Sequence, residues 1–266
     1  MLSEQAMIEA LGRIAVGIGD DAAVLDGGLV AAADMLVEGT HFDRHRLDAR
    51  GIGARAAAAN LSDMAAMGAD PLCLLASLGL PEGYAEVAAL GEGLAGHGVP
   101  LVGGDLARSP CLVVSVAVLG RADRPILRSG GRPGDRLVVT GELGGQAVSG
   151  FTSPVVPRLA EGRALAAVAT AMIDISDGIA GDAARLAAAS GCLAVIELAR
   201  LPVAAGATLE QAAAGGEDYE LLAALPSQTP SPVPVVEVGR LAEGEGVVLL
   251  DPGGSPVDLQ GWDHFA

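Results

Sequence analysis

Aspartate residues recur in short, glycine-flanked clusters, and nearly every cluster lies beside an apolar run. In chain order these clusters are Gly19-Asp20-Asp21, Ala33-Asp34-Met35, Asn60-Leu61-Ser62-Asp63, Gly103-Gly104-Asp105, Asp174-Ile175-Ser176-Asp177-Gly178 and Gly216-Glu217-Asp218. A carboxylate beside a buried strand is costly unless a cation meets it, and one divalent cation can serve several carboxylates. Mg²⁺ prefers oxygen ligands and usually binds together with phosphates. The clusters therefore predict a phosphate-handling site with several Mg²⁺ ions.

The basic residues restrict the chemistry further. All 16 of them are arginines, so the chain has no lysine. This excludes the phosphate-binding lysine of a P-loop, the strand lysine of a protein kinase and Schiff-base catalysis. The phosphates of a bound nucleotide must then be met by metal ions, arginines and backbone N–H groups.

Composition also limits the partners and the compartment. The net charge is −17 and only 2% of residues are aromatic, so neither nucleic acid nor an anionic membrane is an expected partner. Cys73, Cys111 and Cys192 lie far apart in apolar settings, which favours reduced, buried thiols. Glu4 and Glu9 argue against a secretory signal, and no uncharged apolar run is long enough to span a membrane. We expect a cytoplasmic protein.

Several motifs have a plainer structural explanation when taken alone. Asp20-Asp21 can cap a turn, Gly103-Gly104-Asp105 is also an ordinary turn, and Glu217-Asp218 fits a polar hairpin turn. A single histidine such as His41 is more often structural than functional. By contrast, Asp34 lies within an apolar strand that has no structural need of a charge. Helix capping explains one polar residue of the 174–178 cluster, but not all of them.

The elements that must position these residues alternate between strands and helices, which predicts mixed α/β structure. Helices are expected over residues 2–12, 50–67, 82–95, 160–172 and 179–189. Strands are expected over residues 29–35, 72–80, 99–102, 112–119, 136–140, 194–198, 219–225, 235–240 and 247–250. The helix over 50–67 presents Asn60 and Asp63 on one face, and the strand over 99–102 ends at Asp105, where ligands of α/β sheets gather. The polar stretch 121–135 predicts a linker between domains of residues 1–124 and 125–266.

Taken in order, the motifs resemble those of the thiamine-monophosphate kinase family, within the AIR-synthase-like (PurM-like) superfamily. The resemblance covers essentially the whole chain. It is most specific at Gly215-Gly-Glu-Asp-Tyr-Glu-Leu-Leu222 and at the tail Gly261-Trp-Asp-His-Phe265. The other matching stretches are 17–23, Asp34–Phe42, Asn60–Pro71, Gly103–Asp105, Leu127–Gly130, Pro133–Asp135, Thr140-Gly141 and Asp174–Gly178.

The resemblance implies a role for each site residue. The expected Mg²⁺ ligands are Asp21, Asp34, Asp63, Asp105, Asp174 and Asp177. ATP is expected to contact Gly104, Asp105, Arg128 and Ser176. The expected contacts of thiamine monophosphate are His41, Glu217 and Trp262. No catalytic base is expected, because an acceptor phosphate ionises without help, so catalysis rests on positioning and metal ions.

The resemblance also implies a two-domain PurM-like fold and a homodimer whose N-terminal domains pair through their sheets. The implied reaction is Mg²⁺-dependent transfer of the ATP γ-phosphoryl to thiamine monophosphate. Two departures stand out: Ala32-Ala33 replaces a common Ser-Thr before Asp34, and residues 145–157 form a shortened stretch. Alternatives are another ATP-using superfamily enzyme, such as an AIR or selenophosphate synthetase, or a non-catalytic nucleotide-binding homologue, which Ala32-Ala33 motivates.

Overall fold

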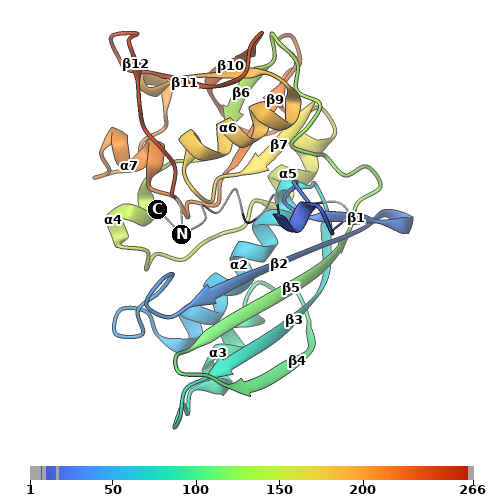
Figure 1. The fold of residues 1–266 in the computed structure, drawn as a ribbon, viewed down its shortest axis with the longest axis vertical. Helices are drawn as coiled ribbons and strands as arrows, with labels where there is room; N and C mark the ends of the chain where they lie inside the picture. The colour runs from blue at the N-terminus through green and yellow to red at the C-terminus, as the bar shows by residue number, and fades with distance from the viewer. Residues whose placement is uncertain (1–6, 8–9, 16–17, 263–266) are drawn as a thin grey trace.

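The computed structural model describes residue 7, residues 10–15 and residues 18–262. Within these ranges the chain forms two β-sheets, each covered by helices, with the helix α2 (Ala49–Ala66) lying between them (Figure 1). The mixed α/β class is therefore confirmed. The helix expected over residues 2–12 lies mostly outside the described residues. No helix in the described ranges is long and apolar enough to cross a membrane.

The N-terminal sheet, within the described residues, has the strand order β1-β2-β5-β3-β4. Its strands are β1 (Ala23–Leu25), β2 (Leu29–Val37), β3 (Asp70–Leu80), β4 (Leu101–Arg108) and β5 (Val113–Arg121), with the 3-10 turn η1 (Asp26–Gly28) after β1. Val114, Val116 and Val118 of β5 are fully buried, whereas the residues between them are not. This alternation shows that one face of the sheet is buried and the other is not. Helices α2 and α3 (Val87–Leu94) cover the buried face, since their apolar residues belong to the same core cluster as these valines.

Helix α2 (Ala49–Ala66) is the element that joins the two halves of the molecule. Asp48 caps it by accepting a hydrogen bond from the backbone N–H of Gly51 at 2.7 Å. Most of the helix is buried on every side, as expected for a helix packed between layers. A Cβ atom at Gly53 would lie 2.1 Å from the backbone oxygen of Leu90 in α3 (Val87–Leu94), so this glycine permits close packing of the two helices.

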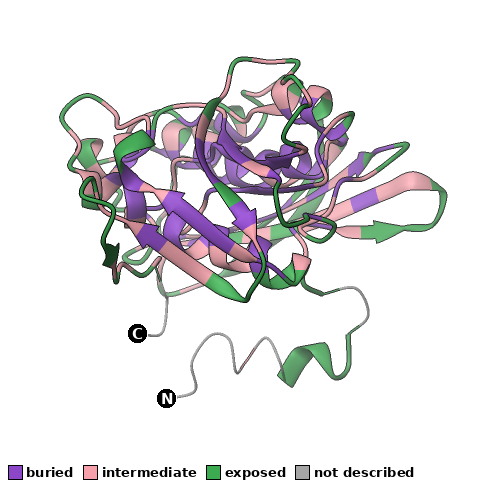
Figure 2. Cartoon of the chain, turned by 90° about the horizontal axis from the view of Figure 1, so that it is seen from above, coloured by how far each residue is buried: buried purple, intermediate pink, exposed green. Residues whose placement is uncertain are grey.

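The C-terminal sheet, again within the described residues, has the order β12-β11-β8-β10-β6-β9-β7. Its strands are β6 (Arg136–Val139), β7 (Ala171–Asp174), β8 (Leu193–Glu197), β9 (Leu221–Leu225), β10 (Val236–Ala242), β11 (Gly246–Leu250) and β12 (Pro256–Val257). The helical segments are α4 (Gly145–Ser149), α5 (Leu159–Ala166), α6 (Ile179–Ser190), η2 (Leu198–Arg200) and α7 (Leu209–Ala214). Figure 2 shows that buried residues concentrate in the strands and helices at the centre of the view, while many exposed residues lie in loops around them.

Three expectations about the elements are wrong. The helix expected over 160–172 ends at Ala166, and Ala171–Asp174 forms strand β7, because its apolar residues pair with β9. Helix α3 begins at Val87 rather than at residue 82, after a turn in which Gly83 has φ +76°. The Gly103-Gly104-Asp105 motif lies inside β4 and pairs with β3, so it does not end a strand.

Candidate active site

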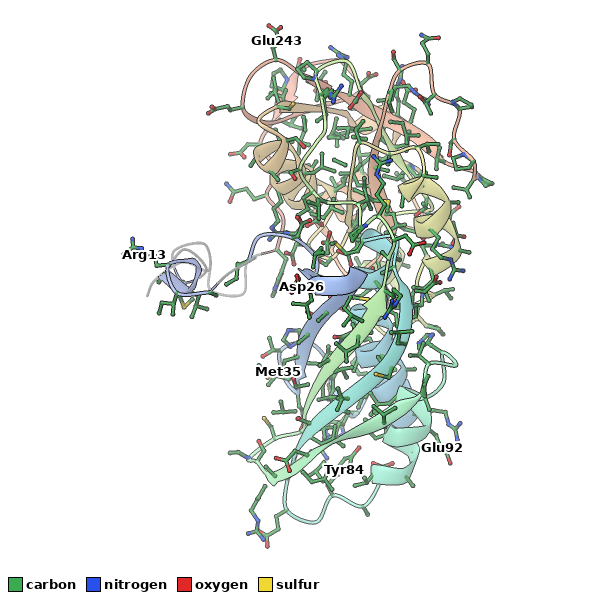
Figure 3. The ribbon with its side chains drawn as sticks, turned by 90° about the vertical axis from the view of Figure 1, so that its right-hand side faces the viewer. Arg13, Asp26, Met35, Tyr84, Glu92 and Glu243 are labelled. Atoms are coloured by element: carbon green, nitrogen blue, oxygen red, sulfur yellow. The ribbon has the colours of Figure 1, made fainter. Side chains whose placement is uncertain are left out.

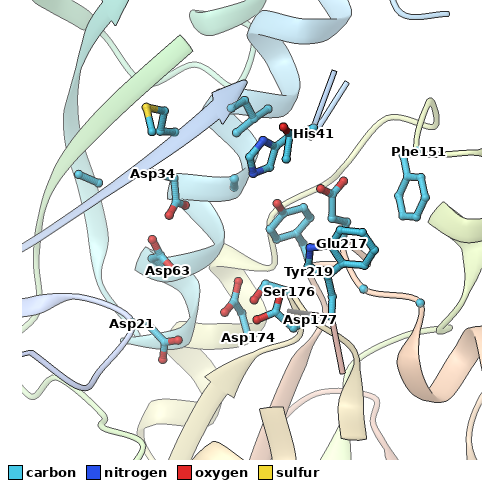
Figure 4. Close-up of a pocket in the computed structure, with 18 of the residues that line it drawn as sticks. Asp21, Asp34, His41, Asp63, Phe151, Asp174, Ser176, Asp177, Glu217 and Tyr219 are labelled. Atoms are coloured by element: carbon cyan, nitrogen blue, oxygen red, sulfur yellow. The ribbon is translucent and has the colours of Figure 1, made fainter. Parts of the chain in front are cut away.

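A cavity of about 420 Å³ opens between the two halves of the molecule, and both contribute to its walls (Figure 4). Most of the residues that the sequence singled out line it: Asp21, Asp34, His41, Asp63, Arg128, Asp174, Ser176, Asp177, Glu217 and Trp262. A second cavity of about 390 Å³ adjoins the first at Thr40, His41 and Phe151. The predicted site residues from distant parts of the chain therefore meet at one place.

Three carboxylates form a compact group within this cavity. Asp21 precedes β1, Asp63 lies on α2 and Asp174 ends β7, and one ligand oxygen from each lies within 4.8 Å of the others. Among the described residues, the buried Oδ2 atom of Asp21 has no hydrogen-bond partner. A donor set made only of carboxylate oxygens, with one buried oxygen unsatisfied, fits a hard divalent cation such as Mg²⁺.

The electrostatics of the group support the same interpretation. Burial raises the pKa of Asp63 well above its ordinary value, and the neighbouring charge of Asp34 raises it further. Burial and the charge of Asp21 likewise raise the pKa of Asp174 well above the usual range. Burial also raises the pKa of Asp34, to about 6. Carboxylates crowded in this way favour protonation unless a cation binds among them.

Hydrogen bonds from α2 hold two of these carboxylate-bearing strands in place. Asn60 accepts a hydrogen bond from the backbone N–H of Asp34 at 3.1 Å, and its own amide donates to the carbonyl of Ala56 at 3.0 Å. The hydroxyl of Ser62 donates to Oδ2 of Asp174 at 2.6 Å. One helical turn of α2 therefore fixes β2 of the first sheet and β7 of the second around Asp63.

Arg128 brings a positive charge to the same group from the segment between the two sheets. Its Nη2 and Nε donate to Oδ1 of Asp21 at 2.6 and 3.2 Å. Its backbone N–H donates to Asp20 at 2.7 Å, and its carbonyl accepts from Ser190 at 2.9 Å. Burial still raises the pKa of Asp21 despite this pairing. The predicted linker thus places a site residue and does more than connect two parts.

Asp177 lies on the other side of the group, in the turn before α6. It forms an ion pair with Arg185 at 2.6 Å, and its backbone N–H donates to Asp182 at 3.1 Å. Burial raises the pKa of Asp182 to about 7, although Arg185 also pairs with it. Asp182 and Arg185 therefore anchor the turn that presents Ser176 and Asp177 to the cavity.

The turn before β9 carries Glu217 in an unusual backbone conformation. Glu217 and Tyr219 have φ values of +56° and +53°, which cost side-chain-bearing residues about 1–3 kcal/mol each. Asp218 holds the turn by accepting hydrogen bonds from the backbone N–H groups of Gly144 at 2.6 Å and Gln146 at 3.2 Å. Strain that the surroundings maintain in this way often marks a functional site.

The remaining predicted contacts of the acceptor come from two other segments. The backbone N–H of Val37 donates to Nδ1 of His41 at 3.1 Å, which orients the imidazole ring. Trp262 is 57% exposed, and its backbone N–H donates to the carbonyl of Asp177 at 3.0 Å. Gly261 permits this docking, since a Cβ atom there would lie 2.8 Å from the same carbonyl.

The Gly104-Asp105 pair is the exception, because these described residues are not among those lining either cavity. Asp105 pairs with Ser77 of β3. Across the next two strands, Ser77 pairs with Ser115 of β5, and Ser115 pairs with Met35 of β2. Residues paired in this way share one face of a sheet. Asp34 instead pairs with the fully buried Val116. Asp105 therefore faces the uncovered side, three strands and about 14 Å from β2.

Sequence reasoning missed several residues at the site. Thr40, Phe151 and Tyr219 line the cavity, and Arg55 forms an ion pair with Glu217 from within α2. Arg55 is the one charged residue in a long alanine-rich part of the expected helix, and that position was the available signal.

Comparison with known proteins gives a consistent picture. Residues 19–122 match the family model described as "AIR synthase related protein, N-terminal domain". The thiamine-monophosphate kinase of Halobacterium salinarum is 36% identical, and the alignment covers 99% of this chain and all of that protein. The enzyme of that name from Salmonella typhimurium is 35% identical, over 95% of this chain and 93% of the relative.

Solved structures agree with these sequence relatives. AaThiL complexed with AMPPCP and TMP superposes with a TM-score of 0.91 at 30% identity, covering 99% of this chain and 97% of that one. Thiamine monophosphate kinase from Aquifex aeolicus gives a TM-score of 0.85 at 28% identity, over 97% of this chain and 98% of that one. A HypE–HypF complex, at 18% identity and a TM-score of 0.75 over 95% and 99% of the two chains, shares the fold alone.

Proposed function

The chain belongs to the thiamine-monophosphate kinase family, and on that premise we propose how its cavity carries out the reaction. The protein is an ATP-dependent kinase that transfers a phosphoryl group to thiamine monophosphate, giving thiamine diphosphate and ADP. The observation that carries the assignment of residues is the meeting of Asp21, Asp63 and Asp174, from three distant segments, in the cavity that His41 and Glu217 also line.

The carboxylate side of the cavity is proposed to hold several Mg²⁺ ions. Asp21, Asp63 and Asp174 would hold one ion, and Asp34 and Asp177 would serve a further one. Bound Mg²⁺ would screen the charges of two phosphate groups that repel each other. Ala32 and Ala33 supply no side-chain oxygen here, so the metal ligands on β2 are restricted to Asp34 and backbone carbonyls.

The protein's own residues are proposed to bind and orient the two substrates. Arg128 and Ser176 would contact the phosphates of ATP, while His41, Glu217 and Trp262 would hold thiamine monophosphate. The acceptor oxygen belongs to a phosphate that is already ionised at neutral pH, so no side chain needs to remove a proton. Catalysis would therefore come from alignment of donor and acceptor in a site walled by Tyr219 and Phe151.

The test of this proposal is a panel of acceptors with matched chemistry. ADP release is measured with ATP and Mg²⁺ in the presence of thiamine monophosphate, thiamine or an aminoimidazole ribonucleotide precursor. Release that depends on thiamine monophosphate supports the assignment. Release that depends on the aminoimidazole compound assigns the chain to another activity of the superfamily, and binding of ATP without any release identifies a non-catalytic homologue.

We also propose that residues 1–124 and 125–266 are two domains and that the protein works in the cytoplasm. A further proposal is that it forms a homodimer through the uncovered face of the N-terminal sheet. Met35 lies on this face, opposite Glu92 of α3 (Figure 3). Large hydrophobic side chains remain exposed on the face and on its β4 edge: Met35, Leu72, Leu75, Leu101, Val102 and Leu106. Exposed apolar surface of this extent is typical of an interface.

The position of Asp105 on this uncovered face gives the dimer a functional meaning, and Gly104 is its neighbour on the same edge strand β4. Since they cannot reach the cavity of their own chain, we propose that they serve the ATP site of the partner chain. Co-expression of Asp34→Asn and Asp105→Asn chains tests this, because each mixed dimer would contain one site with both aspartates. Recovery of about a quarter of wild-type activity is expected from random pairing. No recovery from two inactive variants would show that each aspartate serves its own chain.

A further inference from the structure

We infer that Arg55 is a positioning residue for the acceptor half of the site, because it holds Glu217 in place. The inference rests on the proposed role of Glu217 in binding thiamine monophosphate. Arg55 lies on α2 in the N-terminal half, and Glu217 lies in the strained turn before β9 in the C-terminal half. The pair therefore acts across the cavity that separates the two sheets.

The contacts of Arg55 are specific and almost fully buried. Its side chain is 3% exposed, and its Nε and Nη2 both donate to Oε2 of Glu217, the former at 3.1 Å. Its Nη1 donates to Oε1 of Gln146 at 3.1 Å. Gln146 in turn donates to the carbonyl of Ser153 at 3.3 Å. Because Gln146 holds the buried guanidinium from the other side, the contact with Arg55 restricts the orientation of the Glu217 carboxylate.

Glu217 itself remains open to a ligand. Its side chain is 23% exposed and lines the cavity. Arg55 engages only Oε2, and Oε1 has no hydrogen-bond partner in the part of the chain that the structure describes. A carboxylate fixed through one oxygen by a buried cation can accept an N–H donor through the other. The amino group on the pyrimidine ring of thiamine monophosphate is such a donor. The adenine amino group of ATP is another, so the KM of each substrate has to be measured separately.

A second arginine pair provides a control for the simpler view that Arg55 only joins the two halves. Arg163 on α5 pairs with Asp70 at the start of β3, so this pair also links the C-terminal half to the N-terminal half. Its side chains are 46% and 62% exposed, and neither residue is among those that line the two cavities described above. Loss of either pair removes one ion pair between the halves. Of the two arginines compared, Arg55 contacts a residue of the cavity wall and Arg163 does not.

The test compares Arg55→Met, Arg55→Lys and Arg163→Met with the wild type by steady-state kinetics. Arg55→Met is expected to raise the KM for thiamine monophosphate about 10- to 100-fold, the range for loss of one charge-assisted pair. The KM for ATP should stay within about twofold. Arg55→Lys, which keeps the charge but loses the two-pronged contact, should recover part of the effect. Arg163→Met should change neither KM.

Binding and stability measurements keep the inference falsifiable. Trp262 is the only tryptophan of the chain, so its fluorescence reports binding of thiamine monophosphate separately from turnover. In a protein that already carries Glu217→Gln, adding Arg55→Met should raise the KM for thiamine monophosphate very little further, since the two residues act as one unit. If Arg55→Met does not fold, Arg55→Lys supports the inference when its KM is raised for thiamine monophosphate and not for ATP.

Two outcomes would overturn the inference. One is a KM for thiamine monophosphate that is unchanged in Arg55→Lys and in any folded Arg55→Met. The other is an equal rise in both KM values, which would show that Arg55 only joins the two halves. Failure of the wild type to use thiamine monophosphate is a different result, because it would contradict the proposed function before any variant is measured.

Discussion

Replacement of Asp34 by Asn should stabilise the metal-free protein at neutral pH while abolishing turnover. Burial, together with the charges of Asp21 and Asp177, raises the pKa of Asp34 from 3.8 to about 6. A carboxyl group with a higher pKa in the folded state binds its proton more tightly there. The free energy of unfolding therefore falls as the pH rises from the unfolded pKa through the folded one.

The magnitude follows from the same shift. Two pKa units correspond to about 3 kcal/mol of lost stability above pH 7. Because Asp34 as a residue is only partly buried and lines the open cavity, where water screens its charge, a gain of about 1–2 kcal/mol is expected for the variant. Asn60 accepts its hydrogen bond from the backbone N–H of Asp34, so the substitution leaves that contact intact.

Urea unfolding in EDTA at pH 7.5 and pH 4.0 measures this effect. Asp34→Asn should have a larger free energy of unfolding than the wild type at pH 7.5. The difference should be small at pH 4.0, where the wild-type carboxyl group is protonated in the folded state. Asp26→Asn, at an exposed turn (Figure 3), should change neither value. Saturating Mg²⁺ should stabilise the wild type more than Asp34→Asn, since only the wild type keeps the full ligand set. A destabilised Asp34→Asn at pH 7.5, or a gain that is equal at both pH values, would refute the reasoning.

Three further outcomes are expected. Excess EDTA should abolish turnover and added Mg²⁺ should restore it; undiminished turnover in EDTA would contradict the metal site. If the indole stacks on the cationic thiazolium, Trp262→Ala should raise the KM for thiamine monophosphate by the equivalent of about 1–2 kcal/mol and change the KM for ATP little. A variant that keeps both KM values and only melts at a lower temperature would show that Trp262 is a packing residue. Gly261→Ala should raise the same KM, because a Cβ atom would lie 2.8 Å from the Asp177 carbonyl and displace the tail; an unchanged KM with unchanged Trp262 fluorescence would show that the tail adjusts.

Sequence reasoning identified the residues of the cavity better than the elements that carry them. Asp34 was recognisable because a charge interrupts an apolar strand, and Asp63 because it shares a helix face with Asn60. The sequence did not reveal β7, since Ala171–Asp174 continues an apolar run that fits a helix equally well. Its strand conformation depends on pairing with β9, which lies about 50 residues further along the chain.

Two other features depend on contacts that no local pattern encodes. The face on which Asp105 lies is set by the register of β4 with β3, where the pairing shifts between Leu74 and Leu75. A shift of one residue would turn Asp105 to the opposite face. The partner of Arg55 is Glu217, 162 residues away, and only the packing of α2 between the two sheets brings them together.

Product stoichiometry is the measurement that tests the central claim most directly. Pure protein is incubated with ATP and Mg²⁺, with thiamine monophosphate or with thiamine, and ADP and thiamine diphosphate are quantified together. Direct transfer between phosphates in this cavity predicts equal amounts of the two products with thiamine monophosphate and neither product with thiamine. ADP release without matching thiamine diphosphate, or transfer to thiamine itself, would contradict the account.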